Sequence, residues 1–317
     1  MLKKSIVRSC IKYFLVVAVV ICFPWIFTLA LGQNNGQYIY ETKSSGRYVT
    51  IDDRQVDVED YVAMVLSGHM DIASEEEALK AQAVVIRTYI YEMMEKCGKN
   101  TLSADDTGFV YYTYKELEDI WGEQFEENYN KLMKVVSNTA MEVITYDSRL
   151  IKPYFHLASS GSTRDGAQVI GEEVPYLKSV QSSKDVESEG YLQGMIIDKK
   201  DFVETLRKAK SDISISDDKP LETLQIVSRC EAGYISSLQI GNVTMTGDEF
   251  VYIFGLASPN FQVDEYEGSI RVVTKGCGHG LGLSMYGALK LAEAGKSYKE
   301  IICHYYTDVA VANTSEK

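Results

Sequence analysis

An uncharged, apolar stretch near the N-terminus constrains the fold of this chain more than any other feature. It runs from Tyr13 to Leu31 and follows a short basic segment that carries Lys3, Lys4, Arg8 and Lys12. About twenty apolar residues cross a hydrocarbon core of roughly 30 Å, and short flanks rich in Lys or Arg stay on the cytoplasmic side. We therefore expect residues 1–12 to be a cytoplasmic head, residues 13–31 a single-pass anchor in the cell membrane, and the C-terminal domain extracytoplasmic.

A cleaved signal peptide is the competing interpretation of this segment. The apolar region of a signal peptide is usually shorter and ends in small residues of the A-x-A type, which residues 28–32 (TLALG) match poorly. The length and the missing cleavage pattern favour an anchor. Residues 32–46 then form a polar linker, residues 47–310 one large domain and residues 311–317 a short tail.

The charge balance limits the ligands of the domain. The chain has 32 Lys+Arg and 45 Asp+Glu. Four of the basic residues lie in the head and no acidic residue precedes Glu41, so the remainder carries a formal charge of −17. Such a domain repels nucleic acid and anionic lipid. Its expected ligands are neutral or cationic, and uncharged sugars or amide-rich peptides fit this condition.

The six cysteines do not define a disulfide framework. Two lie in the head and anchor, and Cys97, Cys230, Cys277 and Cys303 are scattered through the domain without C-x-x-C spacing. In an exported domain of this size, sparse cysteines are typically buried small hydrophobic residues. A pairing of Cys277 with Cys303 stays open, because connectivity cannot be read from sequence.

The apolar patterns alternate between periods of two and of 3.6 residues, which predicts an α+β domain of helices and antiparallel strands. Ser74 and Glu77 have the spacing of a capping box at the start of a long helix that ends near Lys96. Other expected helices are 58–66, one or two within 115–139, 201–208, 247–254, 284–294 and 298–305. Expected strands are a pair within 47–56, a hairpin within 141–157, strands within 224–243 and a strand at 270–274.

Three sequence blocks resemble the signature of the stage II sporulation protein D family of peptidoglycan lytic transglycosylases, which share a domain with an amidase enhancer. The blocks fall in the family's order and extend the resemblance over residues 50–306, a combination that single Gly-rich strings do not give. The N-terminal block comprises Val58-Glu-Asp-Tyr61, Glu77-Ala-Leu-Lys-Ala-Gln-Ala83 and Arg87-Thr-Tyr89. The middle block comprises Tyr154-Phe-His156, Ser159-Ser-Gly-Ser-Thr163, Val174-Pro-Tyr-Leu177 and Phe254-Gly-Leu256. The C-terminal block comprises Gly278-His-Gly-Leu-Gly-Leu-Ser284, Tyr286-Gly-Ala288, Lys296-Ser-Tyr298 and His304-Tyr-Tyr306.

The resemblance implies a cleft that binds glycan strands and cuts them without water. In this chemistry one carboxylic acid protonates the glycosidic oxygen and then accepts a proton from the sugar hydroxyl that closes the anhydro ring. The family places this glutamate before a Met-Pro pair, between the first two sequence motifs. Counting without gaps reaches His69, followed by Met70 and Asp71. The catalytic glutamate and its proline are therefore both absent, and the acid of an active enzyme would be His69 or a nearby glutamate, of which Glu75, Glu76 and Glu77 lie close in sequence.

The resemblance also proposes substrate-binding residues, each of which has a structural alternative. His279, between two glycines, and His156, before a Ser- and Gly-rich loop, are candidates for the glycan site, whereas the pattern around His304 favours packing. Gln82 and Arg87 organise the cleft in the family, but a buried Arg is commonly paired with a carboxylate. The further candidates share small size and a place on a loop or helix start: Ser159, Ser160, Gly161, Thr163, Gly280 and Ser284.

No cofactor or metal is expected. Cys277, His279, Cys303 and His304 lack zinc-site spacing, and the cysteines that relatives in clostridia use near His156 are absent. Three functions stay open: a glycan-binding member with reduced or absent cleavage, an active transglycosylase, and a non-catalytic amidase enhancer. The resemblance names the stage II sporulation protein P amidase and the associated protein M as partners, and peptidoglycan strands as the ligand.

Overall fold

The computed structural model describes residues 43–314, which belong to one compact unit that begins at Thr42. The predicted head, the predicted anchor at residues 13–31 and most of the predicted linker lie outside the described residues. Within residues 43–314, no helix is both long enough and apolar enough to span a membrane. The described domain is a mixture of helices and mainly antiparallel strands, so the α+β prediction is confirmed.

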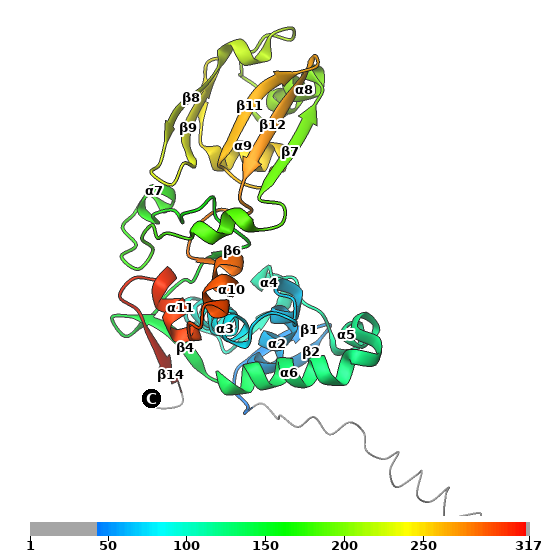
Figure 1. Ribbon diagram of the computed structural model, residues 1–317, viewed down its shortest axis with the longest axis vertical. Helices are drawn as coiled ribbons and strands as arrows, with labels where there is room; N and C mark the ends of the chain where they lie inside the picture. The colour runs from blue at the N-terminus through cyan, green and yellow to red at the C-terminus, as the bar shows by residue number, and fades with distance from the viewer. Residues whose placement is uncertain (1–42, 315–317) are drawn as a thin grey trace, which may run out of the picture. The chain divides into compact units, whose positions relative to one another are not determined.

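One part of the domain, built from residues 48–156 and 283–313, is mainly helical (Figure 1). Its helices are α2 (Val58–His69), α3 (Glu76–Cys97), α4 (Ala104–Thr107), α5 (Tyr114–Trp121), η1 (Gly122–Gln124), α6 (Phe125–Asn138), α10 (Met285–Glu293) and α11 (Tyr298–Tyr305). Its strands are β1 (Tyr48–Ile51), β2 (Arg54–Asp57), β3 (Thr101–Ser103), β4 (Glu142–Tyr146), β5 (Arg149–Leu150), β6 (Phe155–His156), β13 (Leu283–Ser284) and β14 (Ala310–Asn313). The strands form three small sheets in the orders β2-β1-β3, β14-β4-β5 and β13-β6.

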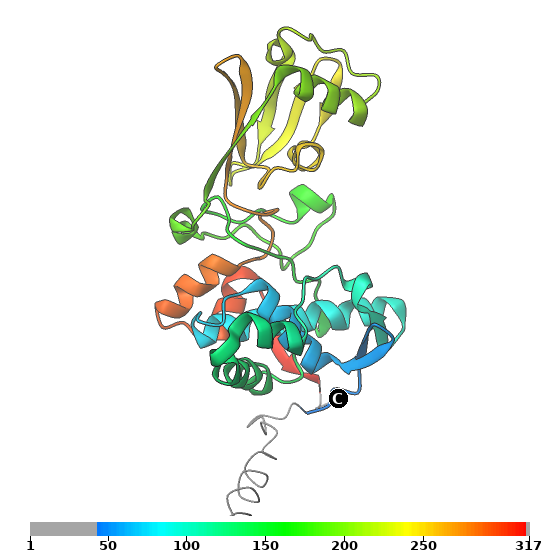
Figure 2. The same cartoon turned by 90° about the vertical axis from the view of Figure 1, so that its right-hand side faces the viewer.

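Helix α3 is the centre of the helical core. It is rich in Ala and other good helix formers, and it ends where Gly98 takes a left-handed conformation with a φ of 63°. The helix contacts α2, α6, α10, α11 and β4, so most of its length is buried. On one side Ala81, Val84 and Val85 pack with Leu283 and residues of α11. Helix α3 and the C-terminal residues 283–306 thereby share one hydrophobic core (Figure 2).

A buried ion pair joins α3 to α2. Arg87 donates two hydrogen bonds to Glu59, Nε to Oε1 at 2.8 Å and Nη2 to Oε2 at 2.7 Å, and both side chains are 0% exposed. The Arg87 guanidinium also donates to the backbone carbonyl of Glu142 at 3.2 Å. Glu59 accepts the backbone N–H of Met141, which holds a positive φ of 60°. The pair thus fixes α2, α3 and the turn before β4 together.

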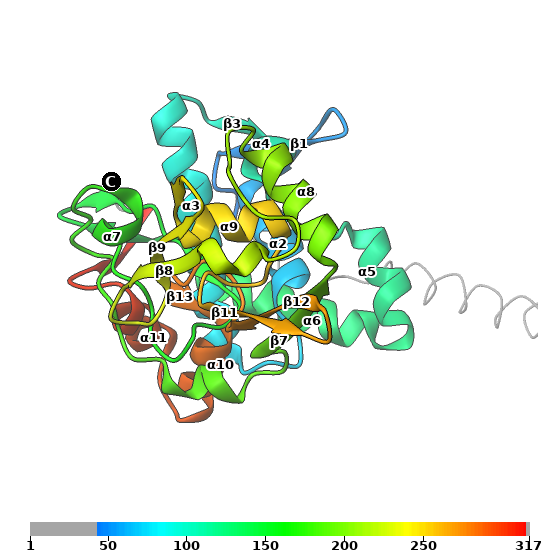
Figure 3. The same ribbon diagram turned by 90° about the horizontal axis from the view of Figure 1, so that it is seen from above.

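The second part of the domain has its own hydrophobic core between two sheets and two helices (Figure 3). Its strands are β7 (Leu192–Ile197), β8 (Leu224–Arg229), β9 (Ile235–Ile240), β10 (Val243–Met245), β11 (Phe261–Tyr266) and β12 (Ser269–Lys275). Its helices, with those of the connection that leads to it, are α7 (Ala167–Ile170), η2 (Ser183–Glu187), α8 (Lys199–Ala209), η3 (Pro220–Thr223) and α9 (Gly247–Phe254). The strand orders are β11-β12-β7 and β10-β9-β8, all antiparallel. Phe202, Phe250 and Phe261 are fully buried at the centre.

Two expectations about secondary structure need correction. Helix α3 begins at Glu76 after an N-cap at Glu75 that makes no side-chain capping bond, so the capping box of Ser74 and Glu77 is wrong. Glu77 instead accepts the backbone N–H of Tyr298, which ties α3 to α11. The second arm of the predicted hairpin at 141–157 shrinks to β5, because β6 pairs with β13.

The cysteines also differ from expectation. Cys277 and Cys303 are both free, so the alternative of a disulfide between them finds no support. Cys97 and Cys303 are exposed rather than buried, and Cys230 and Cys277 are partly buried.

The Arg87–Glu59 pair gives a stability prediction. Glu59→Gln leaves the Arg87 charge buried without its counter-charge, and we expect the free energy of unfolding to fall by about 3–5 kcal/mol in chemical denaturation. The double variant Glu59→Leu/Arg87→Met removes both charges and should lose much less. Lys184→Ala, which removes an exposed ion pair with Glu187, serves as the control and should change stability little. A Glu59→Gln variant as stable as the wild type would contradict this role.

Candidate functional site

His69 lies at the C-terminal end of α2, within a cluster of half-buried aromatic rings. Its ring meets Phe109 edge-on at a centroid distance of 5.6 Å and Phe155 of β6 at 5.5 Å. Tyr89 of α3 packs on Phe109 at 4.9 Å. We call these four residues, His69, Tyr89, Phe109 and Phe155, the aromatic cluster. Its members come from three separate elements and one loop, so only the folded chain forms this surface.

The environment of His69 favours the neutral imidazole. Burial lowers the pKa of His69 below its usual value of 6.5, and a hydrogen bond with the Val65 carbonyl only partly opposes this effect. The Nδ1 atom lies 2.9 Å from the Val65 oxygen, which can only accept, so Nδ1 carries the proton and Nε2 holds a lone pair. A general acid must be protonated before it can donate. His69 is therefore poorly suited to the role of the family glutamate at neutral pH.

The parallel pairing of β6 with β13 brings two other predicted residues together. Leu283 pairs with Phe155 and Ser284 with His156, while Ala158 forms an isolated bridge with Cys277. Side chains alternate along this segment. Phe155 therefore points to the aromatic cluster, whereas the His156 ring lies 5.7 Å from the ring of His279.

His156 and His279 form a neutral imidazole pair. Burial, followed by the neighbouring His279, lowers the pKa of His156 to about 3. Burial and the charge of Arg164 lower the pKa of His279 to about 4. His156 Nδ1 donates to the Leu281 carbonyl at 3.1 Å, and His279 Nδ1 accepts the Leu281 N–H at 3.0 Å. Both rings are thus oriented by the same residue of the Gly-rich segment.

Two glycines are required for this close approach. A Cβ atom added at Gly278 would lie 2.7 Å from the Cβ of His156, and one at Gly280 would lie 2.6 Å from the ring of Tyr234. Both glycines also have positive φ angles, 106° and 77°, which side chains disfavour. The alternation of Gly around His279 is therefore a packing requirement of the site.

The predicted Ser- and Gly-rich loop is held by hydrogen bonds, most of which join it to other segments of the chain. The Ser159 N–H donates to the buried carboxylate of Asp185 at 2.7 Å, and the Ser159 hydroxyl accepts from Gly161 at 3.2 Å. Ser160 Oγ donates to the Ala232 carbonyl at 3.0 Å, and Thr163 Oγ1 accepts the Val180 N–H at 2.9 Å. These bonds give the loop a defined shape rather than a flexible one.

Asp185 is a residue that the sequence patterns did not single out. It is 0% exposed, and burial raises its pKa, while the hydrogen bonds from Ser159 oppose the rise. Helix η2, on which Asp185 lies, packs against α10, and Ser284 caps α10 by accepting the Gly287 N–H at 3.1 Å. Asp185 therefore holds the Ser-rich loop beside the start of α10. Asp185 lies in the mostly polar segment Ser183–Glu187, and nothing in that segment of the sequence indicates that its side chain is buried.

Arg164 holds the other side of His279. Its guanidinium forms two hydrogen bonds with Asp248, at 2.8 and 2.9 Å, and donates to the His279 carbonyl at 3.1 Å. The Arg164 backbone N–H donates to Gly280 at 2.7 Å. This cation explains part of the lowered pKa of His279 and ties the Gly-rich segment to α9.

The predicted residues on α3 lie within the helical core. Gln82 is 0% exposed, and its side-chain amide finds no hydrogen-bond partner within residues 43–314. Arg87 is occupied by Glu59, as described above. Their roles in glycan binding stay predictions. His304 is half-buried, and its Nε2 lies 2.9 Å from the Gln181 carbonyl.

The arrangement offers surfaces for stacking and hydrogen bonding more than groups for proton transfer. The aromatic cluster presents apolar ring faces, and Lys152 adds a cation over the nearby Tyr154 ring at 4.9 Å. Among the described residues, no group of three or more His, Cys, Asp or Glu side chains is arranged to hold a metal ion. Sequence reasoning missed Phe109, because it lies on a loop without a motif, and placed Tyr89 in a family motif without assigning it to the site.

Comparison with known proteins identifies the family of the chain. A family model described as "Stage II sporulation protein" matches residues 48–146. The Stage II sporulation protein D of Bacillus amyloliquefaciens is 31% identical over 263 residues, which cover 81% of this chain and 74% of that protein. The protein of the same name from Bacillus subtilis (strain 168) is 30% identical over 81% of this chain and 75% of its own length. This chain belongs to the stage II sporulation protein D family.

A more distant relative adds a second name. The "Amidase enhancer" of Bacillus subtilis (strain 168) is 24% identical over 289 residues, which cover 76% of this chain but 39% of that protein. The chain therefore resembles a part of the amidase enhancer.

The neutral histidine pair predicts an acid-sensitive fold. The folded pKa values of His156 and His279, about 3 and about 4, lie below the ordinary 6.5, so the unfolded chain binds protons first as the pH falls. Stability is present above pH 6.5 and should fall by up to about 1.4 kcal/mol per pH unit for each histidine as the pH drops below it.

Chemical denaturation between pH 6.5 and 5 measures this slope above the range in which most carboxylates titrate. We expect His156→Gln to reduce the slope more than His304→Gln, which replaces a half-buried histidine outside the pair. Equal slopes for the wild type and His156→Gln would exclude a buried neutral His156.

Proposed function

We propose that this protein is a membrane-anchored peptidoglycan-binding protein of sporulation that has lost most or all of the glycan-cleaving activity of its family. The family membership and the resemblance to an amidase enhancer support a role at the cell wall during sporulation. The apolar segment at residues 13–31 supports an anchor with the N-terminus in the cytoplasm and the domain outside.

The neutral His69 is the observation that carries the proposal. At the position expected for the catalytic glutamate, the chain has an imidazole whose pKa is lowered by burial and whose Nδ1–H is already donated to Val65. A general acid of the usual kind contributes about 10²- to 10⁴-fold to such a reaction. A site that lacks this acid but presents aromatic rings is suited to holding sugar rather than cutting it.

The ligand we propose is the uncharged glycan strand. The half-buried faces of Tyr89, Phe109 and Phe155 offer apolar contact to sugar rings, and the strongly negative domain excludes polyanions. Such a protein would act by bringing glycan to a partner enzyme. The stage II sporulation protein P amidase and the associated protein M are the partners that the family suggests.

Two alternatives remain for the same site. In an active transglycosylase, a nearby glutamate or His69 itself would supply the proton, and His69 could do so only as the imidazolium that burial disfavours. In a pure amidase enhancer, the domain would raise the rate of a peptidoglycan amidase without any catalysis of its own. The likeness to the amidase enhancer favours this second alternative over the first.

The cleavage experiment uses the full-length protein, stem-stripped glycan strands and an assay for anhydro ends. We expect no anhydro product from the wild type or from His69→Ala, and measurable product from His69→Glu, because the new carboxylic acid restores the missing proton donor. His304→Glu is the matched control, since it adds the same group at a half-buried position on α11, outside the aromatic cluster. Product from the wild type that disappears in His69→Ala would make His69 a working acid and reject the proposal.

The binding experiment separates retention of glycan from its cleavage. Phe109→Ala removes a ring of the aromatic cluster, and we expect it to reduce cosedimentation of the protein with insoluble peptidoglycan severalfold. Tyr252→Ala removes an aromatic ring that is 89% exposed on α9 and should have no effect. A wild-type protein that does not sediment with peptidoglycan, or two variants that sediment equally, would argue against this binding surface.

A further inference from the structure

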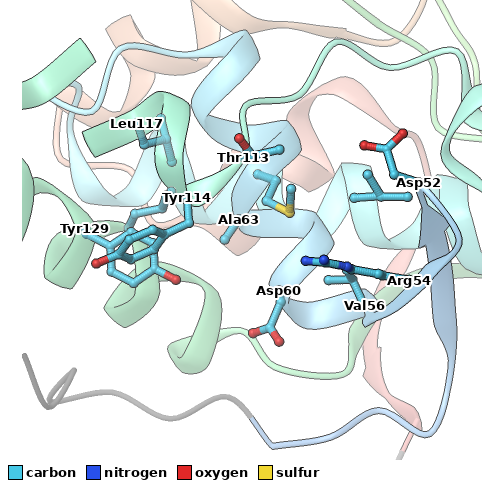
Figure 4. A pocket seen from close by; sticks show the side chains of 12 residues that line it. Asp52, Arg54, Val56, Asp60, Ala63, Thr113, Tyr114, Leu117 and Tyr129 are labelled. Atoms are coloured by element: carbon cyan, nitrogen blue, oxygen red, sulfur yellow. The ribbon is translucent and has the colours of Figure 1, made fainter. Parts of the chain in front are cut away.

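A second surface lies apart from the aromatic cluster. A cavity of about 620 Å³ opens between the β1–β2 hairpin, α2, α5 and α6. Its volume is in the range of sites that hold ligands or side chains of partners. Figure 4 shows the Tyr114 and Tyr129 rings on one side of this cavity and Arg54 and Asp52 on the other. The lining contains no member of the aromatic cluster and neither His156 nor His279.

The walls of the cavity are largely apolar and include an exposed aromatic ring. Leu117 and Leu132 are buried at its base, whereas Tyr114 is 42% exposed. Ile120, one turn further along α5 from Leu117, is 56% exposed. Large apolar side chains that gather at a hollow of the surface are typical of interaction sites.

The exposed ring is held in place before any partner arrives. Tyr114 packs edge-on against Phe125 at a centroid distance of 4.8 Å and against Tyr129 at 5.4 Å. Burial, the charge of Asp60 and the neighbouring Tyr114 raise the pKa of Tyr129 to about 12, so its hydroxyl stays protonated. A rigid aromatic wall of this kind loses little entropy on binding.

The elements around the cavity carry a strong negative charge. Residues 113–127 contain six acidic residues and one basic residue, a formal charge of −5. All six acidic side chains are exposed: Glu116, Glu118, Asp119, Glu123, Glu126 and Glu127. Such a cluster attracts cations over about 8–10 Å at physiological salt. Neither an uncharged glycan nor an anionic lipid surface matches it.

Arg54 adds a donor on the opposite wall. Its guanidinium lines the cavity on the side that faces the Tyr114 and Tyr129 rings (Figure 4). A guanidinium has five N–H donors and binds planar oxygen groups well. The main-chain carbonyl groups of an incoming segment would satisfy it, while the carboxylates of Asp52 and Asp60 on the same lining keep this side compatible with a basic segment.

We propose that this cavity docks a basic segment of a partner protein. One apolar or aromatic side chain of the segment enters the cavity beside Tyr114, its Lys or Arg residues lie along the acidic α5–α6 side, and its backbone carbonyl groups face Arg54. Charge complementarity selects this occupant over a second copy of the chain, which is itself strongly negative. The surface is separate from the proposed glycan site, so each can fail without the other.

The test uses the full-length protein and a fluorescent peptide that alternates Lys with Leu around a central Trp. We expect saturable binding by fluorescence anisotropy that weakens as salt is raised, because exposed charges are screened. The same peptide with Glu in place of Lys should not bind. A third peptide, with Ser in place of Leu and Trp, should bind at least about fivefold more weakly, the loss typical of a contact worth 1 kcal/mol.

Matched variants locate the binding. Neutralising Glu118→Gln, Asp119→Asn and Glu123→Gln together should weaken the Lys peptide at least about fivefold. Asp201→Asn, Glu204→Gln and Asp212→Asn change the net charge equally on and after α8 and should leave binding within about twofold. Tyr114→Ser should weaken binding, and Tyr252→Ser, on α9, should not. Circular dichroism of each variant checks that it is folded.

Three results would overturn the proposal. Equal effects of the two charge triplets would show attraction by net charge alone. Equal binding of the Glu peptide would reject a cationic occupant. Self-association of the wild type that Tyr114→Ser abolishes would assign the cavity to a second copy. Peptidoglycan cosedimentation of the same variants is measured in parallel, and its retention separates this surface from the glycan site.

Discussion

The domain depends on the buried ion pair between Arg87 and Glu59. Two charges removed from water are tolerable only when each finds charged partners and hydrogen bonds inside the protein. Here the guanidinium reaches Glu59 and the carbonyl of Glu142, and the carboxylate also holds the N–H of Met141. One polar contact thus sets the angle between α2 and α3 and the start of β4. His69 ends α2, so the position of the candidate site follows from this pair.

Most helices could be predicted from the sequence because their apolar residues repeat at the helical period. The expected segments 247–254 and 298–305 match α9 and α11 to the residue. The sequence could not predict β6 and β13, which have two residues each and exist only because they pair with one another. Strands β3, β7, β11 and β14 also escaped prediction, since their patterns are short or, in β7, exposed on several residues.

The site was predictable in its motifs but not in its chemistry. The sequence placed His156 and His279 in the site, and the structure brings their rings within 5.7 Å. Nothing in the sequence indicated that both rings would be neutral, because burial and the charge of Arg164 arise only in the folded chain. Phe109 and Asp185 were missed for the same reason. Their importance lies in neighbours that are far away along the chain.

The pairing of β14 with β4 has a consequence for folding during synthesis. Ala310 lies beside Thr145, and Ile301, Tyr305 and Tyr306 fill the same core as α3. Contacts between such distant residues form late, because the long loop between them must first close. A nascent chain that has reached only α9 still exposes the apolar face of α3 and an unpaired edge of β4. The helical core therefore closes only after β14 has been synthesised, and until then these apolar surfaces favour aggregation.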